Sequence, residues 1–327
     1  MLAHALCAGV ALDIIGLAFT DISITERQAW FPPSKKQCER LRIPFQPELE
    51  LNRNRYPKGE NTEYGQASDN TTIVLALLQL LSSEYPLKQR RIPEVIHALS
   101  ASIRTIESET QAWKSKPVGT YPVVDVGLPI PVGIAAGVYA AGVNVDQPTT
   151  FKIARALAGA CGLGISQAKT VVAIASLSRG LLDTGYFEVE DVENLIASNV
   201  CSDNLASALQ SFTRITDPAD WLKYPIKQLP RMSYSESALC SCCWYLLRIA
   251  TQLKGVVFTT VPKECLAEVF DTYLKPQDIG FLFGCLCALS EQTGEEGCYK
   301  LITPVALIDD SPYASRVREL VNTLGEE

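Results

Sequence analysis

The amino-acid sequence predicts an all-α fold, and three observations carry that prediction. Apolar residues recur at intervals of three and four along most of the chain, which is the spacing of one face of a helix. Few stretches alternate with the period of two that half-buried strands require. Small polar residues of the kind that cap helices precede several of the apolar segments. We therefore expect a large helical bundle.

The first half of the chain predicts three helices and a long loop. Leu2 to Leu17 places apolar residues on most helical positions, and residues 21–64 are then polar, Pro-rich and irregular. Ser68 to Thr71 has the composition of a helix cap, and the apolar run Ile73 to Leu81 that follows it predicts a buried helix. A further helix is expected over Arg91 to Trp113.

Residues 114–131 are rich in Gly, Pro and Val and predict a loop. The small-residue run from Gly133 to Gly142 predicts close backbone approach, either of another helix or of a ligand. A second irregular stretch is expected near 218–234. The remaining segments with helical spacing are 148–162, 166–182, 189–198, 202–215, 235–253, 262–273, 278–290 and 311–324.

The length of 327 residues would fit one large domain or two ordinary ones. The linkers are short and the apolar runs are evenly spread, so we expect residues 1–327 to form a single helical domain. Apolar residues make up 47% of the chain, which is enough for a sizeable core and excludes the composition of a disordered protein.

The net charge of −7 argues against a surface built for nucleic acid or an anionic membrane, because phosphate binding needs a basic footprint. The apolar stretch 279–289 is far shorter than the roughly 20 residues that span a membrane. The apolar start of the chain has no Lys or Arg before Arg27 and contains Asp13, so it is interpreted as a core helix. The eleven cysteines are mostly in apolar runs and predict reduced thiols in a cytoplasmic protein.

Familiar catalytic motifs are missing from the sequence. Neither His4 nor His97 has a second histidine at zinc-ligand spacing, and there is no Gly-x-Ser-x-Gly elbow, Walker loop or strand-linked Gly-x-Gly-x-x-Gly. Cys240 and Cys242 are two residues apart, so on a regular helix they point about 200° away from each other. What remains is a set of polar and acidic residues at expected helix ends.

Four segments carry these residues in a characteristic order. Leu12-Asp13-Ile14-Ile15-Gly16 lies in the first helix, and Gly65-Gln66-Ala67-Ser68-Asp69-Asn70-Thr71 opens the next. Tyr234 to Leu239 precedes Trp244-Tyr245-Leu246, and Asp278 to Gly284 is followed by Thr293-Gly294. This order resembles the ADP-ribosylglycohydrolase family, whose members carry Gly-Asp-Ala-Leu-Gly, a Ser/Thr-Asp-Asp-Thr box and a closing Gly-Gly-Asp-Thr-Asp-Thr box.

The resemblance implies a helical bundle that binds ADP-ribose beside two magnesium ions, with a carboxylate that activates water against the anomeric carbon. Magnesium prefers several oxygen ligands, which carboxylates and hydroxyls supply. Carried over to this chain, the resemblance implies Asp69 and Asp13 as catalytic residues and Asn70, Gly133 and Lys275 as substrate-binding residues. It implies Ser68, Asp69 and Asp278 as metal ligands.

The chain departs from the family pattern at several of the metal-binding positions. Asn70 replaces an acid, which keeps an oxygen but loses a charge. Lys275 and Gln277 fall where the closing box has acids, and the Lys275 ammonium either supplies a fixed positive charge there or is exposed to solvent. The middle box is matched only by Val132 to Gly137. We therefore expect at most one weakly bound magnesium ion, or none.

These motifs predict a hydrolase of an N- or O-glycosidic bond in an ADP-ribosyl or nucleoside-like substrate, with a degraded metal site. The ligand would be a small molecule or a protein-linked ADP-ribosyl group. Three alternatives stay open: an inactive protein that binds ADP-ribose or a nucleotide, a fold repurposed for another small molecule, and a purely structural helical protein.

Overall fold

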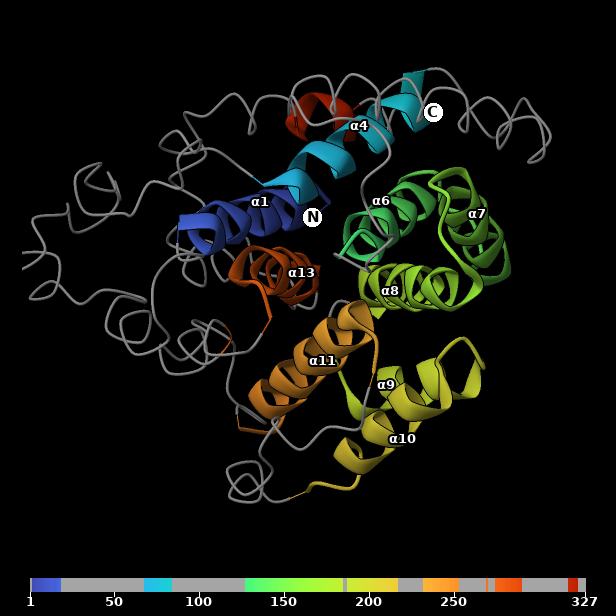
Figure 1. Cartoon of the computed structure of the whole chain (residues 1–327), viewed down its shortest axis with the longest axis vertical. Helices are drawn as coiled ribbons and strands as arrows, with labels where there is room; N and C mark the ends of the chain where they lie inside the picture. The colour runs from blue at the N-terminus through green and yellow to red at the C-terminus, as the bar shows by residue number, and fades with distance from the viewer. Residues whose placement is uncertain are drawn as a thin grey trace, which may run out of the picture.

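The all-α prediction is confirmed in the part of the chain that the computed structural model describes: residues 2–18, 68–83, 127–184, 187–216, 232–252, 269, 274–289 and 317–322. All regular structure there is helical, and these residues contain no strand. The expected loop at 21–64 and the expected helix at 91–113 lie outside the described residues. The helices are α1 (Leu2–Ala18), α4 (Asp69–Ser83), α6 (Pro129–Gly142), α7 (Gln147–Ala160), α8 (Ile165–Thr184), α9 (Val189–Ala197), α10 (Asp203–Phe212), α11 (Tyr234–Gln252) and α13 (Pro276–Leu289) (Figure 1).

The helices α1 and α13 pack antiparallel against each other at very short range. A Cβ atom on Gly284 would lie 2.7 Å from the carbonyl oxygen of Ala8, and one on Gly16 would overlap the backbone of Pro276. Only glycine allows the two backbones to approach so closely. The contact brings the second half of α1, which carries Asp13, beside the first turn of α13.

The helices α6, α7 and α8 form a second packed group beside this pair (Figure 1). A Cβ atom on Gly133 would lie 2.7 Å from Cβ of Ile174, and one on Gly137 would lie 2.7 Å from Cβ of Ser178. The small-residue run of α6 therefore serves helix-to-helix packing against α8. The expected loop at 114–131 is wrong at its end, because α6 already begins at Pro129. Proline fits there because the first turn of a helix has no use for its missing N–H group.

The helix α11 has a well-defined beginning. Its first turn is a reciprocal capping box in which the Glu236 carboxylate accepts hydrogen bonds from the backbone N–H of Ser233 at 3.0 Å and from its Oγ at 2.9 Å. The expected irregular stretch at 218–234 ends one residue later than the structure has it, since α11 already includes Tyr234. The helix packs against α10 on one side and α13 on the other (Figure 1).

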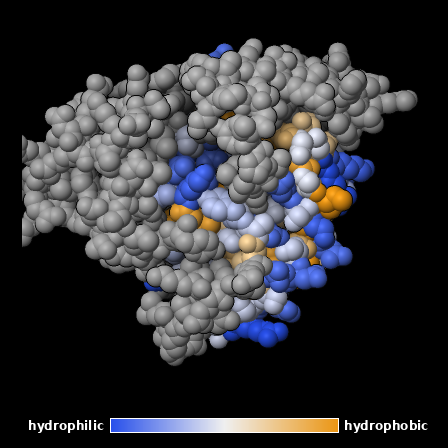
Figure 2. All heavy atoms as spheres, in the orientation of Figure 1, coloured by the Kyte–Doolittle hydropathy of each residue, from blue (hydrophilic) through white to orange (hydrophobic). Residues whose placement is uncertain are grey.

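The described surface visible in Figure 2 is mostly hydrophilic with scattered apolar residues. None of the helices among the described residues is long and apolar enough to cross a membrane. The cysteines of the described segments are all buried except Cys161. Burial raises the pKa of the Cys201 and Cys285 thiols, so these groups stay protonated and unreactive at neutral pH.

Candidate functional site

Asp13 is the centre of a buried hydrogen-bond network that joins α1 to the start of α4. Its side chain has no exposed surface. Its Oδ2 accepts hydrogen bonds from the backbone N–H of Ser68 at 2.8 Å and from Oγ1 of Thr71 at 2.7 Å. Its Oδ1 accepts a third from Oγ of Ser68 at 2.5 Å. A carboxylate this deeply buried is tolerated because several donors of α4 satisfy it.

Ser68 is the N-cap of α4, as its sequence predicts. Its Oγ accepts a hydrogen bond from the backbone N–H of Asn70 at 3.1 Å and donates its own proton to Asp13. The positive end of the α4 dipole therefore faces the Asp13 carboxylate. The cap and the buried acid form one unit, although they are 55 residues apart in the sequence.

Asp278 is a second centre, in the first turn of α13. Its Oδ1 accepts a hydrogen bond from Nδ2 of Asn70 at 2.7 Å, and its Oδ2 accepts one from the hydroxyl of Tyr234 at 2.8 Å. The hydroxyl of Tyr234 accepts in turn from the backbone N–H of Lys275 at 2.8 Å. Asn70 and Asp278 are each only 5% exposed. The starts of α4, α11 and α13 thus converge on one carboxylate.

Gly127, just before α6, lies directly against this carboxylate. A Cβ atom on Gly127 would be 2.8 Å from Oδ2 of Asp278, and the residue has a φ of +88°. Both features favour glycine, since the left-handed region is costly for other residues and a side chain would collide with the acid. The sequence offers no signal for this contact, because neither the sign of φ nor the partner is visible in it.

The two carboxylates influence each other electrostatically. Burial raises the pKa of Asp13 to about 7, against the opposing effect of its hydrogen bonds from Ser68 and Thr71. The negative charge of Asp278 raises the pKa of Asp13 further. Asp13 therefore changes its charge near neutral pH.

This shift predicts a pH-dependent stability. The folded state binds the Asp13 proton more tightly than the unfolded state does, so the stabilising effect of the proton is complete below pH 3.8 and is lost as the pH rises to about 7. Over that window the free energy of unfolding should fall by about 4 kcal/mol on account of Asp13 alone. Urea unfolding between pH 4 and pH 8 measures it. In Asp13→Asn the free energy of unfolding should not show this fall with pH. An equal fall in the variant and in wild type would contradict the raised pKa of Asp13.

The structure brings together the side chains of Asp13, Ser68, Asn70 and Asp278, with Thr71, Gly127 and Tyr234 as further members of the cluster. The carboxylate of Asp13 is buried, and both its oxygens accept hydrogen bonds from the protein. It therefore holds the start of α4 and does not contact a substrate. Asp69 is the first residue of α4, but its side chain lies outside the described residues.

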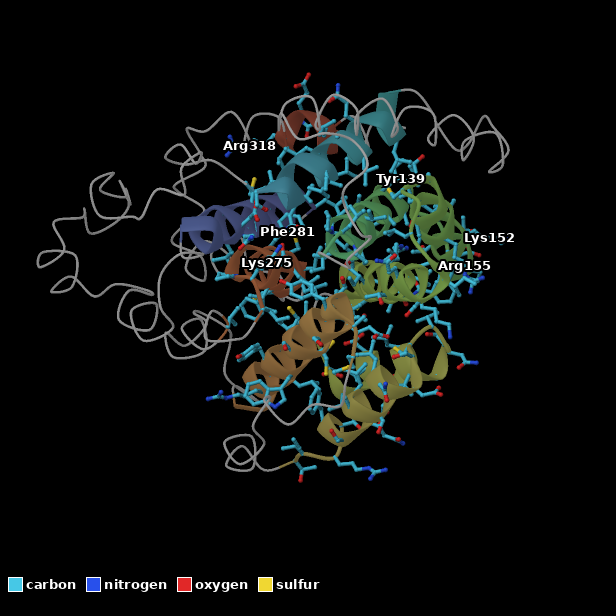
Figure 3. All side chains as sticks on the ribbon, viewed as in Figure 1. Tyr139, Lys152, Arg155, Lys275, Phe281 and Arg318 are labelled. Atoms are coloured by element: carbon cyan, nitrogen blue, oxygen red, sulfur yellow. The ribbon has the colours of Figure 1, made fainter. Side chains whose placement is uncertain are left out.

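Two predicted substrate-binding residues do not join the cluster. Gly133 faces Ile174 of α8 inside the packed core, so it is not available to a ligand there. Lys275 is exposed, which contradicts the hypothesis that its ammonium fills a buried metal position. It lies immediately before α13 (Figure 3), where its backbone N–H donates to the hydroxyl of Tyr234.

The carboxylate oxygens of Asp13 and Asp278 are engaged by the protein itself. All four carboxylate oxygens of Asp13 and Asp278 accept hydrogen bonds from N–H or O–H groups of the protein. Asn70 directs its Nδ2 at Asp278, which places a donor where a cation would need an acceptor. Within the described segments no three His, Cys, Asp or Glu side chains are grouped so that they could hold a metal ion.

No protein-family model matches the sequence, and no curated protein is significantly similar to it. The resemblance to ADP-ribosylglycohydrolases therefore rests on the four sequence motifs alone.

Proposed function

We propose that this protein is an ADP-ribosylglycohydrolase-like hydrolase that cleaves an N- or O-glycosidic bond in an ADP-ribosyl or nucleoside-like substrate. One observation carries the proposal: residues from all four motifs meet around the starts of α4 and α13. Asp13 bonds to Ser68 across 55 positions of the chain, and Asn70 bonds to Asp278 across 208 positions.

The chemistry of such a cleavage suits the cluster. The glycosidic bond breaks through an oxocarbenium-like state, which nearby carboxylates stabilise and which a water molecule activated by a carboxylate then traps. We assign the activation of water to Asp69, which directly follows the cap residue Ser68. Asp278, held by Asn70 and Tyr234, supplies a negative charge at the start of α13. Asp13 fixes the start of α4 from within the core.

The proposal assigns at most one magnesium ion, weakly bound, because Asn70 has replaced an acid and the oxygens of Asp278 already accept protein donors. Catalysis should then depend on Asp69 more than on metal.

Release of ADP-ribose from conjugates of arginine, of serine and of a nucleoside tests the proposal. Asp69→Ala should lower the rate by about 100-fold or more, since a positioned general base contributes roughly 10²–10⁴. A chelator should lower it by much less, and the control Asp203→Ala, at an exposed acid in the first turn of α10, should have no effect. No release from any conjugate, or complete loss with chelator alone, would contradict the proposal.

The closed hydrogen-bond network also favours a second candidate, a protein that binds an ADP-ribosyl ligand without turnover. Both buried carboxylates are already satisfied by the protein, which rigidifies their surroundings and leaves no carboxylate oxygen of the pair free for chemistry. Stabilisation of the fold by ADP-ribose without release of product would identify this case.

A further inference from the structure

Charges of opposite sign are separated onto two neighbouring pairs of helices. Residues 147–182, which cover α7 and most of α8, contain four Lys or Arg residues and no Asp or Glu. Residues 183–213, which include α9 and α10, contain six Asp or Glu residues and no Lys or Arg. The two pairs are neighbours in the bundle, because α8 packs against α9 (Figure 1). A protein with a net charge of −7 thus carries a basic surface beside an acidic one.

The basic surface is formed by Lys152 and Arg155 of α7 and by Lys169 of α8, all of which are exposed. Lys152 and Arg155 are three positions apart, so they are neighbours on one side of α7, and they point away from the bundle (Figure 3). The Nδ–H donors of this surface have no acid to pair with, because none of the three cations forms an ion pair within the described part of the chain.

Lys169 lies close to the other two cations because of the register between α7 and α8. The two helices are joined by the short turn 161–164. Near the other end of the pair, Nε2 of Gln147 donates to the carbonyl oxygen of Ser176 at 3.3 Å. This antiparallel register places Lys169 at the level of Arg155.

The acidic surface is formed by Glu190 and Glu193 of α9 and by Glu188, the N-cap of that helix, and all three are exposed. Glu190 and Glu193 are again three positions apart and therefore neighbours on one side of the helix. The acids are close enough to influence one another: burial raises the pKa of Asp191, and the negative charges of Glu188 and Glu190 raise it further. Cations from outside would relieve this repulsion.

We propose that the protein associates with a second copy of itself, and that the basic surface of one copy docks on the acidic surface of the other. The matched spacing favours this partner. Two cations on α7 and two carboxylates on α9 are each three positions apart, so the two helices form two ion pairs at once when they lie side by side. Because both surfaces belong to one chain, a two-fold dimer makes this contact twice. The association does not depend on the proposed hydrolysis.

Ile165 adds an apolar contact to the basic surface. It is the first residue of α8, one turn before Lys169, and its side chain is 85% exposed. No other large apolar side chain of the described segments is exposed. Exposed ion pairs are individually weak and are screened by salt. We therefore expect a weak dimer whose affinity depends strongly on ionic strength.

Sedimentation velocity at low and high salt tests the proposal. At about 50 mM salt, wild type should form dimers at tens of micromolar protein. At about 500 mM salt the dissociation constant should rise at least tenfold, because the screening length falls to a few ångströms. A wild type that stays monomeric at low salt, or that associates without any response to salt, would overturn the proposal.

Charge reversal on each surface identifies the two partners. Lys152→Glu combined with Arg155→Glu should weaken the dimer by at least about tenfold, because acids then face acids. Glu190→Lys combined with Glu193→Lys should do the same with cations. An equimolar mixture of the two double variants should restore the dimer, since each surface then meets its opposite. A mixture that stays monomeric would contradict the pairing.

Two further variants complete the design. Arg318→Glu lowers the net charge by the same amount as Arg155→Glu, and Arg318 is exposed and lies away from both surfaces (Figure 3). Arg155→Glu should weaken the dimer about fivefold and Arg318→Glu should leave it unchanged. Acids are favoured in the first turn of a helix, so Glu193→Lys alone replaces the double variant if Glu190→Lys disturbs α9.

The remaining outcomes also decide the matter. Equal weakening by Arg318→Glu and Arg155→Glu would show that the overall charge controls association, which overturns the proposed contact. Wild type that stays monomeric but binds vesicles of anionic phospholipid, and loses them in the Lys152→Glu and Arg155→Glu double variant, would assign the basic surface to a membrane and would overturn the second copy as its partner.

Discussion

Replacement of Asp13 by alanine is expected to lower the free energy of unfolding by about 3 kcal/mol at pH 7. The substitution removes the carboxylate that accepts three hydrogen bonds. The backbone N–H and the hydroxyl of Ser68 and the hydroxyl of Thr71 then lose this acceptor. Buried donors that lose their partner each cost about 1–3 kcal/mol, and the relief from no longer burying a carboxylate offsets part of the sum. Urea denaturation followed by circular dichroism measures the change.

The control for this experiment is an exposed acid at a comparable place in a helix. Asp203→Ala in the first turn of α10 should change the free energy of unfolding by less than about 0.5 kcal/mol. A loss below about 1 kcal/mol in Asp13→Ala would show that the three bonds contribute little in solution, and the network would then be a poor candidate for a preorganised site.

The fold class could be predicted from the sequence because helical periodicity is a local signal, and so could the cap at Ser68, whose partners lie within the same turn. The meeting of Asp13 with Ser68 and of Asn70 with Asp278 is not local. The sequence indicates it only through the order of motifs, since each motif by itself is an ordinary helix end.

The contacts of Tyr234 and Gly127 with Asp278 have no signal in the sequence. Tyr234 reaches Asp278 through a contact between two helices, and Gly127 is selected by a φ of +88° and by the oxygen beside it. Lys275 shows the opposite case. Its motif left open whether the ammonium is buried or exposed, and the structure has it exposed, because a long charged side chain before a helix start reaches water easily.

Asn70→Asp is expected to convert the bond between α4 and α13 into a repulsive pair. The amide of Asn70 lies 2.7 Å from Oδ1 of Asp278, and both residues are buried. Two carboxylates about 4 Å apart repel each other by roughly 4 kcal/mol at an intermediate effective dielectric constant. In the presence of chelator the variant should therefore lose about 3–4 kcal/mol of its free energy of unfolding at pH 8, and lowering the pH should restore part of it as one acid is protonated.

The effect of magnesium on stability should show whether the Asn70→Asp variant is destabilised by repulsion between two carboxylates or by loss of packing. A divalent cation between the two carboxylates would stabilise only the folded state, by about 2.7 kcal/mol at 100 times its Kd. Thermal unfolding of Asn70→Asp should thus shift upward with millimolar Mg²⁺, while wild type and the exposed control Asn194→Asp on α9 should not respond. Wild type that is itself stabilised by Mg²⁺ would show that the amide of Asn70 does not exclude the cation, and an unresponsive Asn70→Asp variant would show that this carboxylate pair cannot hold one.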